Sequence, residues 1–429
     1  MIEIINIIFL ILSMIWITFF PLIKGDLSSN LINYKISNLE RIGVNLSFFL
    51  NILLILSFYN FNQQYIFFTL IFLSLGNFFL FYKKIIYEDL YVLFLFTFIL
   101  SISISSNLQL EWDAAALWIY KTTNFLFGNN FKNLSEIPGV ISYPHLGTYI
   151  WAFFWKNSFF DAEYVGRIFY VFIYSLSILI IFDFKKKQFL KKILLVFVFF
   201  ILSIDYFLLS GYQEYLVFSI LIFIFYYYFK YYKSRNIFFL IPIAFFINAA
   251  IWIKNEASFF ILFFFFFVFF HYLINKTKIN KEIIFLSIFF VIAVLLKYFI
   301  FYENFNLINT GWHGYQTSNL SKIFHLSYFI ERSSLIIASI FVALIKCKVY
   351  LVFFMSALFF INKKNLKEIL PFILFLFLNL LLIFLIYYTT NDIRWEHYLA
   401  TTVDRLLFQT SGVFLLPILF YLKENIKLK

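Results

Sequence analysis

The stretch Ile243–Phe270, IAFFINAAIWIKNEASFFILFFFFFVFF, contains the pattern that decides the fold of this chain. Two apolar runs are separated by Lys254, Asn255 and Glu256, and each run extends to the length needed to cross a bilayer once its flanking residues are included. Charged side chains at such places are costly and are rarely kept without a role. The same pattern, membrane-length apolar runs with short polar islands at their ends, recurs along the chain.

The composition indicates an integral membrane protein. The 429 residues are 63% hydrophobic and 13% charged, with a mean hydropathy of +0.90. A soluble domain carries about a quarter charged residues. We therefore predict an all-α polytopic membrane protein. Cys347 is the only cysteine and cannot form an internal disulfide.

The net charge of +12 does not indicate nucleic-acid binding, because the basic residues lie in short clusters between apolar runs. The positive-inside rule accounts for such clusters if they are cytoplasmic. This assignment predicts a multi-pass protein of the inner (plasma) membrane with its N-terminus outside and its C-terminus inside. The main clusters lie at 83–84, 185–192, 230–235, 276–281, 363–367 and the C-terminus.

Thirteen apolar runs have roughly the length of a membrane span, and the run at 349–361 is the shortest. The first run lacks a basic leader and a cleavage site, so we predict a retained span. The runs lie at about 2–22, 42–60, 65–82, 88–107, 164–182, 191–208, 212–229, 236–253, 257–274, 283–302, 349–361, 368–388 and 403–422.

The predicted organisation is one membrane domain. Residues 1–87 would add N-terminal helices to a core at 88–429, which carries external loops at 108–163 and 303–348. We expect 322–346 to lie along the outer interface as an amphipathic helix, because a second crossing there would break the charge rule.

Five polar islands at the ends of the runs carry the candidate site, and alternation of the spans places all five on the external face. They are Glu111–Asp113 with Lys121, Tyr143–His145, Gly211–Glu214, Lys254–Glu256 and Arg394–Arg405.

The first island holds two carboxylates beside a tryptophan. Glu111 and Asp113 suit general-base work or the binding of a divalent metal. Lys121 follows Asp113 by eight residues and is predicted to share its helical face. Alternatively, Asp113 could cap the helix that begins at Ala114.

The second island follows a loop that contains glycine and proline. Pro144 favours an extended turn that could aim Tyr143 or His145 at a site, and histidine has a pKa suited to a base or a phosphate partner. An equally good interpretation makes His145 an ordinary residue of the membrane interface.

Two further islands open apolar runs with a carboxylate. Glu214 and Glu256 could each interact favourably with a helix N-terminus. Lys254 and Asn255, beside Glu256, would be costly without partners, which favours a binding role.

The last island flanks the final run. Arg405 is predicted to lie just inside the final span, where a guanidinium suits a buried phosphate, and His397 precedes it as a second candidate. Alternatively, Arg405 pairs with Asp404 or Glu396 and holds helices together.

In this order the islands resemble motifs of the GT-C superfamily of membrane glycosyltransferases, in particular bacterial relatives of protein O-mannosyltransferases and the lipid A aminoarabinose transferase. The resemblance covers roughly residues 88–422. It rests on Trp112-Asp113-Ala114 with Trp118 and Lys121, Tyr143-Pro144, Gly211-Tyr212 with Glu214, Lys254-Asn255-Glu256, and Asp404-Arg405-Leu406 with His397. Two positions depart from it, since Glu214 replaces the usual aspartate and Ala257 the usual glycine.

The resemblance implies a GT-C-like fold and transfer of a sugar from a polyprenyl-phosphate carrier to a glycan, lipid or protein acceptor outside the cytoplasm. Asp113 would be the general base, with Glu111 or Glu214 orienting the acceptor or sharing a metal. Arg405 and Lys254 would contact the carrier phosphate, with Lys121 and His397 as further candidates. The alternative is a transporter or flippase of lipid-linked sugars, whose charges would line a path near the middle of the membrane.

Overall fold

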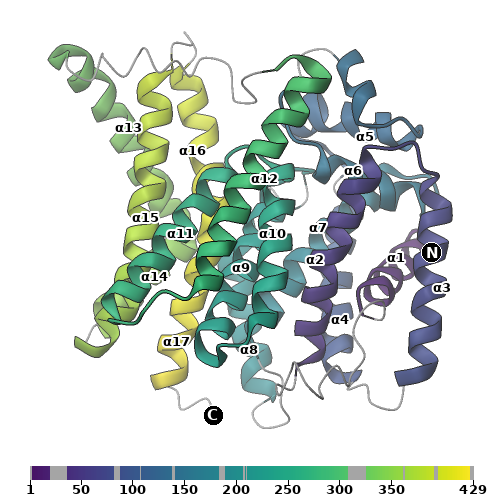
Figure 1. Cartoon of the computed structure of the whole chain (residues 1–429), viewed down its shortest axis with the longest axis horizontal. Coiled ribbons are helices and arrows are strands. Elements are labelled where there is room, and N and C mark those ends of the chain that lie inside the picture. The colour runs from purple at the N-terminus through teal and green to yellow at the C-terminus, as the bar shows by residue number, and fades with distance from the viewer. Residues whose placement is uncertain are drawn as a thin grey trace.

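The structure is a computed structural model that describes residues 2–19, 36–81, 87–106, 108–137, 141–182, 189–205, 208, 210–307, 325–360, 363–390 and 395–425. These residues form helices and turns, with no β-strand among them. In Figure 1 the axes of most of the long helices, including α2, α10, α12 and α15, are roughly aligned with one another.

Nine helical segments in the described part of the chain are long and apolar enough to cross a membrane, which confirms the all-α polytopic class. The last is a continuous span of two α-helices joined by a 3₁₀ turn, η7 (Gly412–Phe414). The segments are α1 (Ile2–Phe19), α2 (Asn38–Ser57), α4 (Tyr87–Ser106), α7 (Glu163–Ile180), α9 (Glu214–Ser234), α11 (Ala257–Ile274), α12 (Lys281–Phe305), α15 (Lys363–Thr389) and α16 (Trp395–Ser411) with α17 (Leu415–Asn425).

The other four predicted runs form helices that do not meet the same criteria by themselves. Their status as spans stays a prediction. They are α3 (Gln63–Phe81), α8 (Phe189–Ser203), α10 (Leu240–Ile253), which follows the turn η5 (Ile237–Phe239), and α14 (Lys348–Phe360).

A sharp break separates α13 (Leu326–Lys346) from α14 at Cys347, where the two helices are bent by 82°. Together they meet the criteria of a span, as one broken crossing or a re-entrant pair. A helix is thus present from residue 326 within the expected range 322–346, and 322–324 lie outside the described residues. The expected course of this helix along the outer interface, without a crossing, stays a prediction. α13 packs against α15 and α16, while α14 packs against α17.

The centre of the molecule is formed by α7 and α9, which pack on each other. α7 is buried along nearly its whole length, so it is surrounded by protein on all sides. Buried hydroxyl groups need hydrogen-bond partners. The phenol of Tyr174 accordingly bonds Ser203 at 2.8 Å, and that of Tyr227 donates to the Glu40 carbonyl at 2.8 Å.

Short helices between α4 and α7 gather at one end of the molecule, at the top of Figure 1. Consecutive antiparallel helices bring the start of α9, the end of α10 and the starts of α11 and α16 to this same end. This arrangement agrees with the expectation that the polar islands lie at one end of the molecule. The short helices are η2 (Ala114–Trp118), α5 (Ile119–Leu126), η3 (Phe131–Glu136) and α6 (Leu146–Lys156).

Candidate functional site

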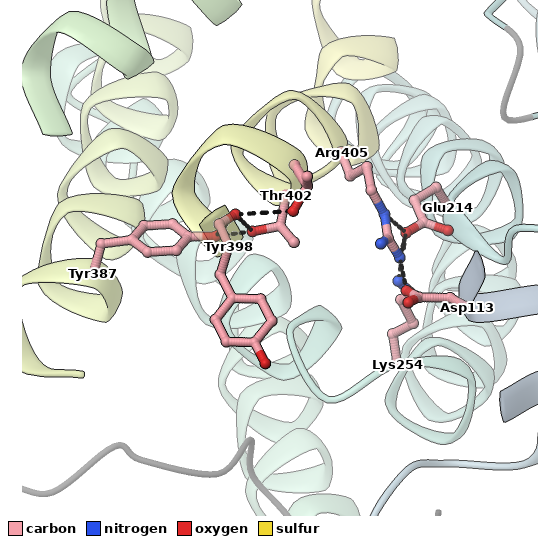
Figure 2. A network of polar contacts seen from close by, with 8 residues as sticks. Asp113, Glu214, Lys254, Tyr387, Tyr398, Thr402 and Arg405 are labelled. Carbon is pink, nitrogen blue, oxygen red and sulfur yellow. Dashed lines mark hydrogen bonds and ion pairs between the residues drawn. The ribbon is translucent and has the colours of Figure 1, made fainter. Parts of the chain in front are cut away.

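Four polar residues from distant parts of the chain form one connected network, which we call the arginine cluster: Asp113, Glu214, Lys254 and Arg405 (Figure 2). Asp113 precedes η2, Glu214 begins α9, Lys254 follows the end of α10, and Arg405 lies in α16. Four of the predicted islands therefore meet in one place.

Glu214 is the buried centre of the arginine cluster, with no exposed side-chain surface. Its Oε1 accepts from Lys254 Nζ at 2.7 Å, from Arg405 Nε at 2.7 Å and from Arg405 Nη2 at 2.6 Å. Its Oε2 is buried and has no hydrogen-bond partner in the described part of the chain. Glu214 therefore fixes the guanidinium of Arg405 through one of its two carboxylate oxygens.

Asp113 is the more accessible carboxylate, with 15% of its side chain exposed, and it pairs with Arg405 Nη2. Its side chain makes no capping hydrogen bond to the helix that follows, so the capping interpretation is wrong. The residues after it form a turn of π-helix, an irregularity frequent at functional sites. Arg405 thus holds Asp113 from one side while part of its carboxylate stays open.

The turn before α9 holds the two halves of the arginine cluster together. The backbone N–H of Glu111 donates to the Ser210 carbonyl at 3.2 Å, which joins the segment before η2 to this turn. Gly211 has a φ of 84°, a conformation that residues with a side chain rarely adopt. The guanidinium of Arg405 then lies over the ring of Tyr212, 4.3 Å from its centroid.

The partners of Arg405 differ from the two that the sequence suggested. Asp404 pairs instead with Lys346 at 3.4 Å, and no ion pair joins Glu396 to Arg405 among the described residues. Adjacent residues on a helix point in different directions, so only Arg405 faces the centre of the molecule. Arg405 does hold helices together, but through Asp113 and Glu214.

A second group, the lysine cluster, consists of Lys121, Asn255 and Lys297 with the backbone carbonyls of residues 142 and 143. Lys121 Nζ donates to the Tyr143 carbonyl at 2.5 Å. Lys297 Nζ donates to Asn255 Oδ1 at 2.7 Å, and Asn255 Nδ2 donates to the Ser142 carbonyl at 3.3 Å. Because Asn255 follows Lys254 directly, the two clusters are neighbours in the structure.

The charges of the two clusters are balanced differently. The arginine cluster pairs two cations with two carboxylates. In the lysine cluster both lysines are buried and donate to neutral oxygen atoms. Burial, and next the positive charge of Lys297, hold the pKa of Lys121 well below its ordinary value of 10.5. An anion placed beside these lysines would relieve that cost.

The sequence predicts that Lys121 shares the helical face of Asp113. Its Nζ donates to the Tyr143 carbonyl, and no ion pair joins it to the arginine cluster in the described part of the chain. A π-helical turn lies between Asp113 and Lys121, and such a turn changes the angular spacing of a regular α-helix. Tyr143 contributes its carbonyl, and its ring packs edge-on against Trp118.

His145 is buried in an aromatic cage formed by Phe58, Phe125, Phe131 and Trp252. Its Nε2 shares a 2.6 Å hydrogen bond with Ser57. Burial, followed by the charges of Lys121 and Lys297, holds the pKa of His145 well below 6.5. Because its side chain is fully enclosed by protein, His145 is not a residue of an interfacial belt, and a packing role fits best.

Three other predicted positions lie outside the two clusters or at their edge. Glu256 stands at the start of α11 without a side-chain capping bond and acts electrostatically on Lys297. His397 is exposed in the first turn of α16. Arg394 lies outside the described residues.

Sequence reasoning missed Lys297 and gave Tyr212 no role. Lys297 is a single lysine within the apolar run 283–302 and is buried, while most of α12 is exposed at the molecular surface. The cost of a charge at such a position was the available signal.

A separate polar set lies on another side of α16 (Figure 2). Tyr387 contacts Thr402 and donates to the Tyr398 carbonyl at 3.4 Å, and Thr402 donates to that same carbonyl at 2.8 Å. These contacts join α15 to α16 and so fix the helix that carries Arg405.

Within the described residues, no three His, Cys, Asp or Glu side chains converge in a way that could hold a metal ion. Comparison of the chain with models of known protein families, with curated proteins and with solved structures gave no match.

Proposed function

We propose that this protein is a membrane glycosyltransferase that moves a sugar from a polyprenyl-phosphate carrier to an acceptor hydroxyl on the external face of the membrane. The observation that carries the proposal is the arginine cluster. Four islands separated by up to about 300 residues meet in one network, and one carboxylate of that network is partly accessible. Buried charge gathered at one end of a membrane protein is typical of a functional site.

In this proposal Asp113 accepts the proton of the acceptor hydroxyl as its oxygen attacks the anomeric carbon. The bond between that carbon and the phosphate oxygen breaks, and the polyprenyl phosphate leaves. Glu214 fixes Arg405 through one carboxylate oxygen, and Arg405 holds Asp113, so these two residues orient the base.

The charge balance revises the expected phosphate contacts. Arg405 and Lys254 are already paired with carboxylates. Neither lysine of the lysine cluster is ion-paired with a carboxylate among the described residues, although Glu256 acts on Lys297 electrostatically. A leaving phosphate is best stabilised by fixed cations in a site that excludes water. We therefore assign the carrier phosphate to Lys121 and Lys297, with Asn255 positioning Lys297.

The number of spans and their GT-C-like arrangement are part of the same proposal. A GT-C-like architecture of thirteen spans requires that α3, α8, α10 and the α13–α14 pair also cross the membrane. Support comes from their apolar composition and from the near-parallel course of α3 and α10 with the longer helices (Figure 1). The external location of the site rests on the positions of the basic clusters.

The experiment uses purified protein and a panel of radiolabelled polyprenyl-phosphate sugars. Release or transfer of sugar from one donor in detergent is the expected result. If no donor is consumed, but proteoliposomes move the intact lipid-linked sugar across the bilayer, the protein is a transporter or flippase and the proposal fails.

A further inference from the structure

Two exposed lysines flank the break between α13 and α14. Lys346 ends α13 and Lys348 begins α14, and they are separated by Cys347, where the helices bend by 82°. The side chain of Lys346 is 64% exposed, and Lys348 is exposed as well. Exposed lysines within an otherwise apolar broken span are costly unless they meet a headgroup or an anion.

The break is held in place on both sides. Tyr350, in the first turn of α14, donates to the Leu407 carbonyl at 3.0 Å and hydrogen-bonds Thr410 at 2.8 Å. Near the other end of α13, Arg332 donates to the Thr390 carbonyl at 2.8 Å and lies over the ring of Trp395. The two lysines are thus presented by helices that are anchored to α15 and α16.

The local charge favours an anion. The one carboxylate that pairs with these lysines in the described part of the chain is Asp404, at 3.4 Å from Lys346, and its side chain is 38% exposed. A pair this long and this exposed is weak. The start of α14 adds the partial positive charge of a helix N-terminus.

Both helices present apolar side chains next to the lysines. This combination of paired cations and an exposed apolar surface matches a phosphate attached to a long hydrocarbon chain. The exposed side chains are Phe341, Val342 and Ile345 on α13 and Leu351, Phe354 and Met355 on α14.

We propose that Lys346 and Lys348 bind the phosphate of a polyprenyl phosphate arriving from the bilayer, at a docking site separate from the arginine and lysine clusters. Asp404 directly precedes Arg405 in α16 and points to α13, while Arg405 points to Asp113. The docking site and the arginine cluster are therefore on two sides of one helix. The choice of a polyprenyl chain rests on the proposed function.

The test measures binding of radiolabelled undecaprenyl phosphate to the full-length protein in phosphatidylcholine nanodiscs. The double variant K346Q/K348Q should weaken binding roughly tenfold or more, whereas K346R/K348R should keep it. K156Q removes an exposed lysine at the end of α6 and serves as the matched control, with unchanged binding expected. D404N should strengthen binding, since it frees Lys346, whereas a merely structural ion pair predicts no gain.

Undecaprenol, which lacks the phosphate, should compete poorly, and so should phosphatidylglycerol. Unchanged binding in K346Q/K348Q, or equal competition by phosphatidylglycerol, overturns the docking site. These results are separable from the proposed function. Sugar transfer with lysine-independent binding removes only the docking site, whereas lysine-dependent binding without any sugar transfer removes only the transferase.

Discussion

At the scale of single residues, the central feature is the division of labour between two carboxylates. Glu214 is buried and receives three nitrogen contacts on one oxygen, whereas Asp113 is partly exposed and, in the described part of the chain, pairs with Arg405. A carboxylate that must approach a substrate needs access, and one that orients a cation needs burial. The structure therefore favours Asp113 as the reacting group and Glu214 as a positioning residue.

Arg405→Lys should lower turnover by about 10- to 100-fold although the positive charge is kept, because lysine has one nitrogen and cannot replace both the Nε contact with Glu214 and the Nη2 contacts with Glu214 and Asp113. Adding Asp113→Asn to this variant should cost little more than Asp113→Asn alone, since both changes disable one unit. Additive losses in steady-state turnover would show that Arg405 acts independently of Asp113.

His145 predicts a specific dependence of stability on pH. Because its pKa in the folded protein is well below 6.5, the unfolded chain binds a proton first as the pH falls. The contribution of neutral His145 to the free energy of unfolding is therefore fully present above about pH 6.5. Below that pH it decreases, by at most about 1.4 kcal/mol per pH unit. His145→Gln keeps a partner for Ser57 but cannot titrate, so its apparent melting temperature should fall less between pH 7.5 and 5.5. Equal slopes in both proteins would contradict the assignment.

At the scale of elements, the turn before α9 is the part on which the site depends most. A Cβ at Gly211 would lie 3.0 Å from side-chain atoms of Leu110, Ala114 and Trp151, and φ is positive. Gly128 has a similar φ of 86°, but a Cβ there would meet nothing within 4 Å. Comparing alanine substitutions at Gly211 and Gly128 therefore distinguishes the effect of steric crowding from that of backbone strain.

Gly211→Ala should destabilise the protein by about 1–3 kcal/mol and reduce turnover, because it displaces the turn that leads to Glu214. Gly128→Ala should cost only the strain of the positive φ and leave turnover unchanged. Thermal unfolding and activity of both variants decide between the two expectations. An equal effect of the two substitutions would mean that packing around Gly211 does not position the site.

Element by element, the sequence predicts where helices end better than where side chains point. The lengths of the apolar runs and the charges at their ends were sufficient to predict that Asp113, Glu214, Lys254 and Arg405 lie at one end of the molecule. The direction of Lys121 could not be predicted, because it depends on a π-helical turn that no residue pattern signals. The pairing of Asp404 with Lys346, and the broken span that makes it possible, depend on tertiary packing between α13 and α16.

At the scale of the whole molecule, the proposed site requires a fixed orientation in the membrane. Charge alternation predicts that η3 lies outside and that the connection between α11 and α12 lies in the cytoplasm. In a variant with Cys347 replaced by serine, single cysteines at exposed Ser135 and exposed Lys278 test this orientation. An impermeant thiol reagent should label position 135 in intact cells, and position 278 only after the membrane is opened. Labelling of both positions in intact cells would contradict the topology.

Asp113→Asn tests the central claim most directly, because the substitution removes the proposed base and keeps the size of the side chain. With a radiolabelled polyprenyl-phosphate sugar that the wild-type protein consumes, we predict that the variant still binds the donor but transfers sugar roughly 10²- to 10⁴-fold more slowly. Glu136→Gln, which changes an exposed carboxylate in η3, should behave as the wild type. Transfer at the wild-type rate by folded Asp113→Asn protein would show that the arginine cluster does not supply the catalytic base.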